Sequence, residues 1–421
     1  MAICTFANCA YLSETSRMIA LHKKLEAKDI NVVMATHGGP YEWLFKEEGI
    51  DYKLIDPYMT HERARQFVQT NTGEKGIREF YEVSELRESV EQEIAFFKSS
   101  DVTKVVTGFT LSCGISARAV GIPLIVTHLG SFVPPVFERN MLVPTLVLNL
   151  KIFKLIPRSW LVKMINNLMY KSRIATKTFN QVAKEFSIKP FHSMTEMMMG
   201  DTVVVTDVPE ILGIPKDELE AWQPAKNAKY YSYPATLRYG GAIYAKLFGD
   251  VPEEVAAFLK TDLPKIYVAL TSGESQVLDR VYEAVKGLKA RVIICSTLHQ
   301  FEMKHAPNIM VIDYLPSHKV MPLMDLAIIH GGQGSVQTAI EAETPIIGIP
   351  LHVEQGLNVS IVEKHGAGLM QIKHDIDPIE IRAKIERILN QRSFKTNMER
   401  LSKLQRKVDG VKKAVDIILE S

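Results

Sequence analysis

The sequence has few cysteines and no long apolar run, and these absences exclude several classes of protein. Only four of the 421 residues are cysteines, and none lies in a CxxC pair or in a His/Cys cluster with zinc-ligand spacing. We therefore expect reduced, structural thiols and a cytoplasmic protein. No apolar stretch is long enough to span a bilayer, and the apolar start lacks the basic region of a signal peptide.

The sequence also lacks an excess of either charge. Its formal net charge is only +2, which argues against a dedicated nucleic-acid-binding protein. Hydrophobic residues make up 46% of the chain, which is enough for well-packed globular domains. Because 421 residues exceed the size of one typical hydrophobic core, we expect two domains.

Short β-rich runs alternate with helical patterns along the chain, which is typical of α/β domains with parallel sheets. The candidate strands of the first half are Ile3–Phe6, Asn31–Ala35, Tyr52–Ile55, Lys104–Thr107, Leu124–Val126 and Thr202–Val205. Those of the second half are Lys265–Leu270, Arg291–Cys295, Ile309–Ile312, Leu326–Ile329, Ile346–Ile349 and Leu369–Ile372. Long helical patterns cover Gly76–Ser99 and Phe394–Leu419.

The domain boundary is predicted from composition. Residues 222–240 are rich in Pro, Tyr and Gly and show no clear period, so we interpret them as a linker. We expect an N-terminal domain over residues 1–225 and a C-terminal domain over residues 226–400. A closing helix over residues 401–421 would pack back on the first domain.

The most informative stretch is His330–Thr344, which reads HGGQGSVQTAIEAET. Apolar runs on both sides, and the helical spacing of Val336, Ala339 and Ile340, predict a strand, a tight turn, a helix and a strand. Such a turn directs backbone N–H groups and the positive end of a helix at one point. We therefore predict a binding site for an anion such as a diphosphate.

This order of residues resembles the donor signature of the GT-B nucleotide-sugar glycosyltransferases. The nearest group is the inverting family that includes macrolide, plant-metabolite and UDP-glucuronosyl transferases. The signature continues through Pro350, the Glu354-Gln355 pair and Asn358. Further matches are the segments Tyr314-Leu315-Pro316, Tyr233-Pro234 and Val268-Ala269-Leu270-Thr271-Ser272. The resemblance is strong over residues 310–360 and weak in the first half.

The resemblance implies two Rossmann-like domains with parallel sheets that face each other across a cleft. The N-terminal domain would hold the acceptor and the C-terminal domain the nucleotide sugar. The enzyme would move a sugar from a nucleotide diphosphate sugar, with UDP or dTDP as the nucleotide, to a hydroxyl of a small hydrophobic acceptor. It would need no cofactor and no metal ion.

The resemblance also assigns roles to residues of the donor site. The diphosphate would be bound by His330, Gly332, Gly334, Ser335 and Ser272, the sugar by Glu354 and Gln355, and the nucleobase and ribose by Tyr314 and Thr338. Ser335 could instead be a plain helix N-cap. Thr338 departs from the family, which usually has a Glu that holds both ribose hydroxyls, and Glu343-Thr344 replaces the usual Gly-Val.

The catalytic dyad of the family is absent. Glu14 stands where the family has its general-base His, and Gly108 stands near the place of the partner Asp. Glu14 is our candidate base, because burial in a cleft would raise the pKa of its carboxyl toward neutral pH. The alternative is that Glu14 only caps the first helix. His37 and His128, each at the end of a candidate strand, are the reserve candidates.

Two other functions remain open at this point. The absent dyad and Thr338 would suit a non-catalytic partner protein that binds a nucleotide sugar. A GT-B hydrolase or epimerase that acts on the nucleotide sugar itself would need no acceptor. The sequence Asp375-Ile376-Asp377 resembles a metal-binding DxD motif, but Pro378 and Glu380 after it indicate a helix cap instead.

One segment has an unusual charge pattern. Between Arg139 and Lys184 there are nine Lys or Arg residues and no Asp or Glu, interleaved with apolar residues. Core-packing helices with a solvated basic face would explain the pattern. The alternative is a surface that meets an anionic membrane, as in a peripheral membrane protein, or an apolar acceptor. The sequence predicts no oligomeric state.

Overall fold

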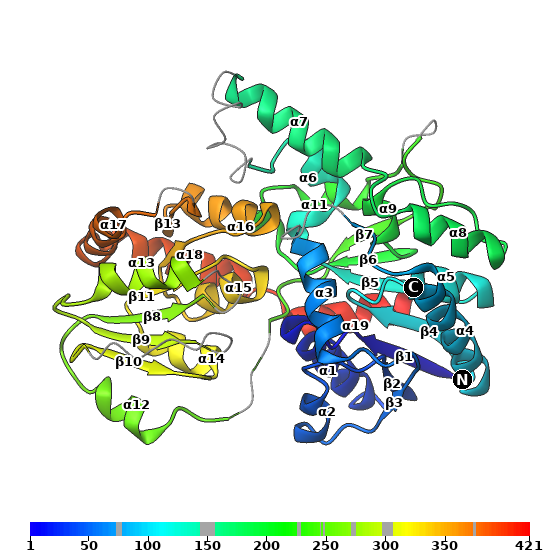
Figure 1. Ribbon diagram of the computed structural model, residues 1–421, viewed down its shortest axis with the longest axis horizontal. Coiled ribbons are helices and arrows are strands. Elements are labelled where there is room, and N and C mark those ends of the chain that lie inside the picture. The colour runs from blue at the N-terminus through cyan, green and yellow to red at the C-terminus, as the bar shows by residue number, and fades with distance from the viewer. Residues whose placement is uncertain are drawn as a thin grey trace. The chain divides into compact units, whose positions relative to one another are not determined.

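The computed structural model describes all residues except 73–77, 144–155, 225–228, 245, 247–248, 271–274, 297–305 and 374–375. The chain forms two compact units, each an α/β domain with one parallel sheet (Figure 1). The first unit contains Met1–Met141, Lys163–Ile243 and Val408–Ser421, and the second contains Leu142–Val162 and Tyr244–Lys407. The predicted pair of Rossmann-like domains is confirmed.

The first unit has a seven-stranded sheet of order β3-β2-β1-β4-β5-β6-β7. The strands are β1 (Ala2–Ala7), β2 (Val32–Thr36), β3 (Tyr52–Leu54), β4 (Val102–Thr107), β5 (Leu124–His128), β6 (Thr202–Val205) and β7 (Thr236–Tyr239). The helices are α1 (Leu12–Glu26), α2 (Trp43–Glu47), α3 (His61–Thr72), α4 (Val83–Ser99), α5 (Cys113–Val120), α6 (Pro134–Glu138), α8 (Lys177–Glu185), α9 (Met194–Met197), α10 (Pro209–Leu212), α11 (Lys216–Glu220) and α19 (Gly410–Glu420). Helix α7 (Arg158–Lys171) contains one of the points, between Val162 and Lys163, at which the chain passes from one unit to the other.

The second unit has a six-stranded sheet of order β10-β9-β8-β11-β12-β13. The strands are β8 (Lys265–Ala269), β9 (Arg291–Cys295), β10 (Ile309–Ile312), β11 (Leu326–Ile329), β12 (Ile346–Gly348) and β13 (Gly368–Met370). The helices are α12 (Glu253–Phe258), α13 (Ser275–Val285), α14 (Ser317–Val320), α15 (Gln333–Glu341), α16 (Val353–Lys364), α17 (Pro378–Asn390) and α18 (Ser393–Gln405).

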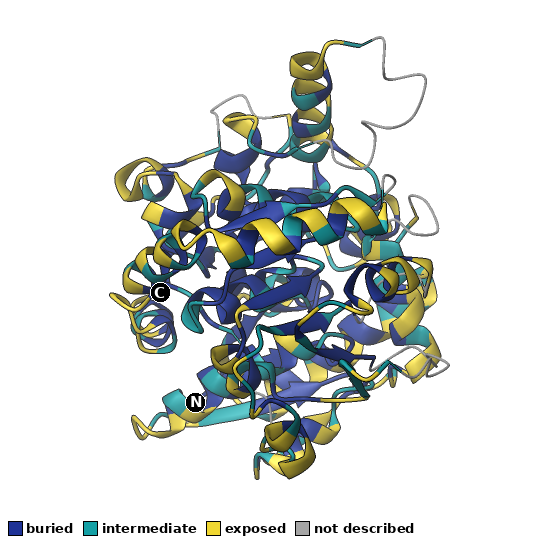
Figure 2. Cartoon of the chain, turned by 90° about the vertical axis from the view of Figure 1, so that its left-hand side faces the viewer, coloured by how far each residue is buried: buried dark blue, intermediate teal, exposed yellow. Residues whose placement is uncertain are grey.

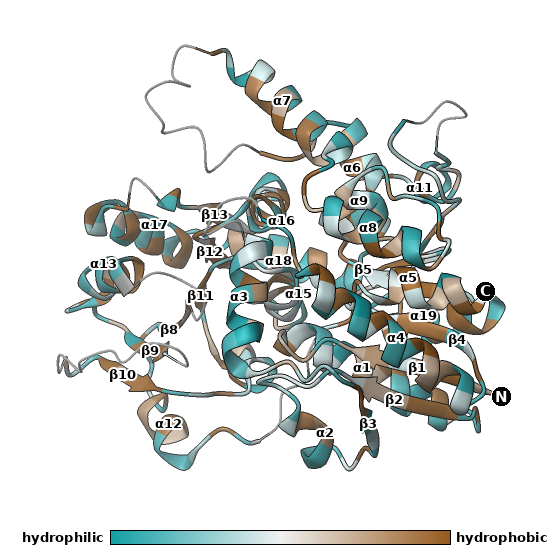
Figure 3. Ribbon diagram, turned by 45° about the vertical axis from the view of Figure 1, so that its right-hand side comes forward, coloured by the Kyte–Doolittle hydropathy of each residue, from teal (hydrophilic) through white to brown (hydrophobic). Residues whose placement is uncertain are grey.

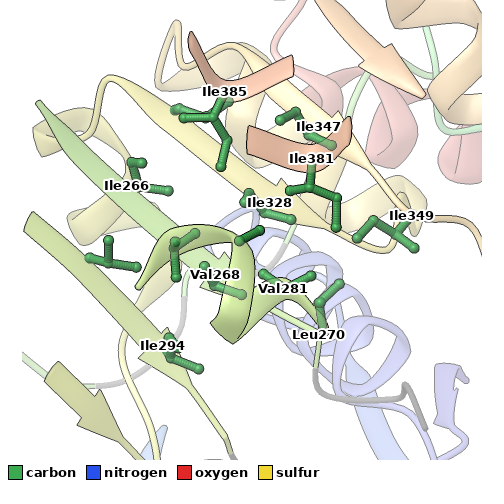
Figure 4. Packing of buried hydrophobic residues seen from close by; sticks show 14 of the residues in the cluster. Ile266, Val268, Leu270, Val281, Ile294, Ile328, Ile347, Ile349, Ile381 and Ile385 are labelled. Atoms are coloured by element: carbon green, nitrogen blue, oxygen red, sulfur yellow. The ribbon is translucent and has the colours of Figure 1, made fainter. Parts of the chain in front are cut away.

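Branched apolar side chains form the core of the second unit. Val268 and Ile328 of the central strands β8 and β11 are fully buried and pack with Val281 of α13 and with Ile381 and Ile385 of α17 (Figure 4). β-Branched residues suit central parallel strands, because both faces of such a sheet are covered. In both units, burial is greatest along the strands and decreases toward the outer faces of the helices (Figure 2).

Every strand predicted from the sequence is present, but β7 was missed because it lies within the stretch interpreted as a linker. Residues Thr202–Val205 pair in parallel with Thr236–Tyr239, so β7 is the edge strand of the first sheet. The preceding turn is also fixed to this unit, because the buried Glu196 carboxylate accepts the backbone N–H groups of Ser232 and Tyr233. The chain therefore leaves the first unit after Ile243, later than the predicted boundary at 225/226.

The closing helical pattern is divided into two helices, and the chain returns to the first unit at Val408. Asp409 separates α18 from α19, because its side chain caps α19 by accepting the N–H of Lys412. Helix α19 packs on α1, and the Lys104 ammonium donates to the carbonyl of Ile418 at 2.6 Å. The first unit thus contains both ends of the chain.

Close packing at the start of α19 generates a prediction. A Cβ atom at Gly410 would lie 2.0 Å from the carbonyl oxygen of Ala242, whereas one at Gly114 in α5 would lie at least 3.6 Å from any neighbour. We expect Gly410→Ala to lower the free energy of unfolding by about 1–3 kcal/mol through this overlap. Gly114→Ala, the matched control, should be neutral or stabilising by up to ~1 kcal/mol. Denaturant unfolding of both variants would show equal losses if the packing were incorrectly described.

Candidate donor and acceptor sites

The predicted anion site is built by the turn between β11 and α15. Gly331 has a φ of +89°, and a Cβ atom there would lie 2.3 Å from Cγ2 of Val359 on α16. The chain therefore needs a glycine at this position to turn closely over α16. Gly332 is the N-cap of α15 and supplies no side chain to cap the helix. Because N–H groups of a first helical turn have no acceptor within the helix, this end of α15 suits an anion.

The structure corrects the alternative that Ser335 is a plain N-cap of the helix. Since Gly332 is the N-cap, Ser335 lies at the third position of the helix and is not its N-cap. The predicted apolar side of the helix is confirmed, because Val336, Ala339 and Ile340 are buried. The glycine that the backbone conformation requires, Gly331, was not among the residues predicted for the site. The sequence signal for Gly331 is the first glycine of the HGG motif. The requirement for glycine there is seen only from its positive φ.

Two imidazoles lie next to the turn. Burial lowers the pKa of His330 to about 4, and a hydrogen bond to the backbone of Ala269 partly opposes this shift. Its Nδ1 atom is buried and has no hydrogen-bond partner among the described residues. Burial also lowers the pKa of His352 to about 4, with a smaller contribution from His330. Both side chains are therefore neutral at pH 7 and can accept a hydrogen bond from a ligand.

His352 was not predicted, although it directly precedes α16 and the expected sugar-binding pair. Its Nδ1 atom lies 3.7 Å from Oε2 of Glu354. The other carboxylate oxygen of Glu354 accepts from the amide of Asn358, which also donates to the carbonyl of Gly331 at 3.0 Å. Asn358 therefore fixes Glu354 relative to the glycine turn. Gln355 is buried, and its Oε1 accepts the backbone N–H of Leu351 at 2.8 Å, so this half of the side chain supports the loop.

Of the residues expected near the nucleoside, Thr338 is buried and Tyr314 is partly exposed. Thr338 is buried, and its hydroxyl donates to the carbonyl of Gly334 at 2.8 Å. Its proton is used within α15, so only the oxygen lone pairs could serve a ribose. Tyr314 follows β10 and is 36% exposed, which suits a ring that a base could contact. Ser272 lies outside the described residues.

Glu14 is the central ionisable group of the first unit. It is only 4% exposed, and its carboxylate accepts backbone N–H groups of Asn8 at 2.7 Å, Gly108 at 3.0 Å and Phe109 at 3.3 Å. Burial raises the pKa of Glu14 to about 7, against the opposing effects of Arg17 and these hydrogen bonds. The carboxylate thus connects α1 to the ends of β1 and β4. Glu14 lies in the first turn of α1, but its carboxylate binds backbone N–H groups outside that helix.

The absence of a partner Asp has a steric reason. A Cβ atom at Gly108 would lie 2.6 Å from Cγ and 2.9 Å from Oε1 of Glu14. An aspartate at this position would overlap with the Glu14 side chain and add a second negative charge. The two departures from the family pattern, Glu14 and Gly108, therefore form one coupled arrangement.

The two reserve histidines differ in the atoms that they offer. His37 has both nitrogens occupied, with Nδ1 at 2.9 Å from the carbonyl of Ile55 and Nε2 at 2.9 Å from Oε1 of Glu93. Glu93 is fully buried and also accepts the hydroxyls of Ser112 and Ser116. This arrangement is a structural network, and it leaves His37 without a nitrogen for an acceptor hydroxyl.

His128 retains one nitrogen that could bind a ligand. It ends β5, and its Nδ1 lies 3.1 Å from the carbonyl of Leu129. Its Nε2 atom is buried without a partner among the described residues. Burial lowers the pKa of His128 to about 4, so the side chain is neutral and Nε2 accepts hydrogen bonds. A lone pair with so low a pKa makes a weaker base than Glu14 at neutral pH.

The described residues contain no group of three His, Cys, Asp or Glu side chains arranged to bind a metal ion. Asp377 instead caps α17 by accepting the N–H of Ile379 at 2.9 Å, with Pro378 in the first turn, as the capping pattern predicted. Asp375 lies outside the described residues. Across the part of the chain that the structure describes, no helix is long and apolar enough to cross a bilayer.

Comparisons with known proteins agree with this architecture. Residues 279–406 match the family described as "Erythromycin biosynthesis protein CIII-like, C-terminal domain". A "PGL/p-HBAD biosynthesis glycosyltransferase" of Mycobacterium tuberculosis is 26% identical over 328 residues, which cover 77% of this chain and 72% of the relative. A "PGL/p-HBAD biosynthesis rhamnosyltransferase" of Mycobacterium bovis is 24% identical, with 77% and 68% covered.

Solved structures show the same fold. The glycosyltransferase VinC in complex with DTDP superposes with a TM-score of 0.66 at 15% identity, covering 100% of this chain and 99% of VinC. The spinosyn rhamnosyltransferase SpnG complexed with spinosyn aglycone gives a TM-score of 0.64 at 14% identity, covering 99% and 100%. The fold is therefore GT-B, and the matched relatives are named glycosyltransferases. With the match of residues 279–406, these findings confirm the resemblance to glycosyltransferases drawn from the sequence.

Adjacent glycines of the turn provide a matched pair of variants. Gly331→Ala combines a positive φ with a Cβ that would lie 2.3 Å from Val359, so we expect it to lower the unfolding midpoint of the protein. Among the described residues, a Cβ at Gly332 would meet only the His330 ring, at 3.5 Å from Nε2. Gly332→Ala should therefore preserve the midpoint and weaken nucleotide binding. Calorimetric unfolding with and without a nucleoside diphosphate measures both effects, and a destabilised Gly332→Ala would contradict this description.

Proposed function

We propose that this glycosyltransferase transfers a sugar, with inversion, from a nucleotide diphosphate sugar to a hydroxyl of a small hydrophobic acceptor, without a metal ion. The observation that carries the proposal is the glycine turn before α15, which presents a helix N-terminus beside two neutral imidazoles. The acceptor class is supported by SpnG, a protein of the same fold that was solved with a spinosyn aglycone. VinC, solved with DTDP, supports a UDP or dTDP donor.

The donor would be bound mainly by backbone groups. The diphosphate would meet the N-terminal turn of α15, including Gly334 and Ser335, where the helix dipole favours negative charge. A bound diphosphate would also favour a proton on Nδ1 of His330, because a nearby anion raises the pKa of an imidazole. Glu354, held in place by Asn358, would accept hydroxyl protons of the sugar.

The acceptor would be activated by Glu14. In its ionised form the carboxylate removes the proton of an acceptor hydroxyl, and the hydroxyl oxygen forms a bond to the anomeric carbon from the face opposite the diphosphate. The bond between the anomeric carbon and the diphosphate oxygen breaks at the same time, and the electron pair stays on the leaving diphosphate. The N-terminal end of α15 stabilises this charge, as a metal ion does in other enzymes.

The pKa of Glu14 makes this role testable. A base acts in its ionised form, so transfer by the native enzyme should rise with pH and level off above about 7, the raised pKa of Glu14. Glu14→Gln should lower kcat by about 10²–10⁴-fold and abolish this pH dependence. A pH series of initial rates measures both, and an unchanged profile in the variant would contradict the assignment. His128→Asn, the control for the reserve base, should retain the rise near pH 7.

The donor can be tested separately from catalysis. A ligand that binds only the native state raises the unfolding midpoint, so a UDP or dTDP sugar should do so while a GDP sugar should not. The Glu14→Gln protein should keep the same shift, because Glu14 belongs to the first unit. If no nucleotide sugar raises the midpoint, the donor site is wrongly assigned.

An assay of sugar transfer and donor consumption, combined with this midpoint measurement, separates the two other functions. A non-catalytic partner protein would show the midpoint shift but no sugar transfer to any of a broad panel of acceptors. A hydrolase or epimerase would consume the donor rapidly without an acceptor, whereas a transferase should release nucleotide slowly until the acceptor is added.

A cytoplasmic enzyme with a hydrophobic acceptor would also benefit from peripheral membrane contact through residues 139–184.

A further inference from the structure

Helix α7 has an exposed face that combines large apolar side chains with cations. Trp160 is 70% exposed, and Met164 and Leu168 are each 47% exposed, at a spacing of four residues. Lys163, Asn167 and Lys171 are exposed at the intervening positions of the same helical face. We call the set Trp160, Lys163, Met164, Asn167, Leu168 and Lys171 the outer face of α7. Figure 3 shows the apolar stretches along this helix.

The opposite face of α7 holds the helix to the protein. Leu161 and Asn166 are buried, at 2% and 0% exposure. The carbonyl of Met169 accepts the hydroxyl of Thr195, and the Tyr170 hydroxyl donates to the carboxylate of Glu138 at 2.8 Å. The helix is therefore anchored by Leu161 and by these hydrogen bonds, whereas its outer face stays exposed. The exposed apolar residues are unusual, because the exposed side of an ordinary surface helix is polar.

The charged side chains of α7 itself have one sign. Arg158 and Lys163 have no ion-pair partner within the described residues, and no Asp or Glu occurs in the sequence between residues 139 and 184. A second copy of the chain seated on this face would bring lysine against lysine at short range, which is unfavourable. A partner with an apolar interior and a negatively charged surface would complement both the apolar side chains and the cations of this face.

We propose that the outer face of α7 docks on an anionic lipid bilayer. The helix would lie in the interface plane with Trp160, Met164 and Leu168 among the acyl chains and Lys163 and Lys171 at the lipid headgroups. The inference rests on the proposed function, because a hydrophobic acceptor concentrates in a bilayer. Docking would therefore bring the acceptor-binding unit to the acceptor.

Vesicle sedimentation with the full chain tests the docking. The native protein should bind vesicles of phosphatidylcholine with phosphatidylglycerol more tightly than vesicles of phosphatidylcholine alone. The triple variant Trp160→Gln/Met164→Gln/Leu168→Gln should bind at least about tenfold more weakly, through lost apolar burial. The double variant Lys163→Gln/Lys171→Gln should lose roughly 30-fold, at about fivefold per cation near an anionic surface.

Matched control variants carry the same changes elsewhere. Ile379, which is 76% exposed on α17, and the exposed Lys53 and Lys98 provide the apolar and charge controls. Ile379→Gln and Lys53→Gln/Lys98→Gln should bind vesicles like the native protein, and all variants should keep the native unfolding midpoint. Equal losses in control and α7 variants would overturn the proposal, and so would absence of binding by the native protein.

Two further measurements separate this inference from others. If light scattering shows a dimer that the triple variant dissociates, a second copy covers the face and the membrane proposal is wrong. Sugar transfer by the native protein to a water-soluble acceptor, measured without vesicles, tests the proposed function alone. Transfer without vesicle binding would therefore refute only the docking, and vesicle binding without transfer would refute only the proposed chemistry.

Discussion

Backbone N–H groups at the carboxyl ends of parallel strands are the constraint on which both sites depend. In the first unit they bind an anion that the protein supplies, the Glu14 carboxylate, through Asn8, Gly108 and Phe109. In the second unit the turn after β11 and the start of α15 present such groups as well, and we propose that they bind an anion from outside. Parallel sheets make this arrangement recur, since each strand ends at the same edge and a helix begins shortly afterwards. The same geometry can thus position a base in one domain and a leaving group in the other.

Glycine is what allows the backbone to approach so closely. Gly108 gives the Glu14 carboxylate access to the end of β4, and any side chain there would overlap with it. Gly331 lets the chain turn over Val359 with a positive φ. The Glu14 carboxylate is nevertheless costly to ionise, because burial outweighs the three hydrogen bonds and raises its pKa to about 7. That balance makes a carboxyl group usable as a base near neutral pH, where an exposed glutamate would be too weak.

Much of the fold could be predicted from the sequence, because apolar strands and helical periods are local signals. Strand β7 could not be predicted, since its role as an edge strand depends on pairing with β6 and on the anchoring of Ser232 and Tyr233 by Glu196. The division of the closing helix was visible only in part, as Asp409-Gly410, whose packing on Ala242 is a tertiary contact.

For the candidate site, the sequence identified the turn and Glu14 but not the state of each side chain. The occupied nitrogens of His37 and the intrahelical hydroxyl of Thr338 follow from partners distant in the sequence or from helix geometry. His352 carried no motif of its own, and only the structure shows that it lies near His330. The resemblance could therefore nominate residues, whereas the hydrogen-bonding capacity of each side chain required the structure.

The central claim is that the N-terminal end of α15 binds the diphosphate of the donor. Titration calorimetry with uridine or thymidine, the monophosphate and the diphosphate, at constant ionic strength, tests it most directly. We predict that affinity increases at each step and most strongly when the second phosphate is added, and that Gly332→Ala removes this increment. Equal affinities for the nucleoside and its diphosphate would contradict the account.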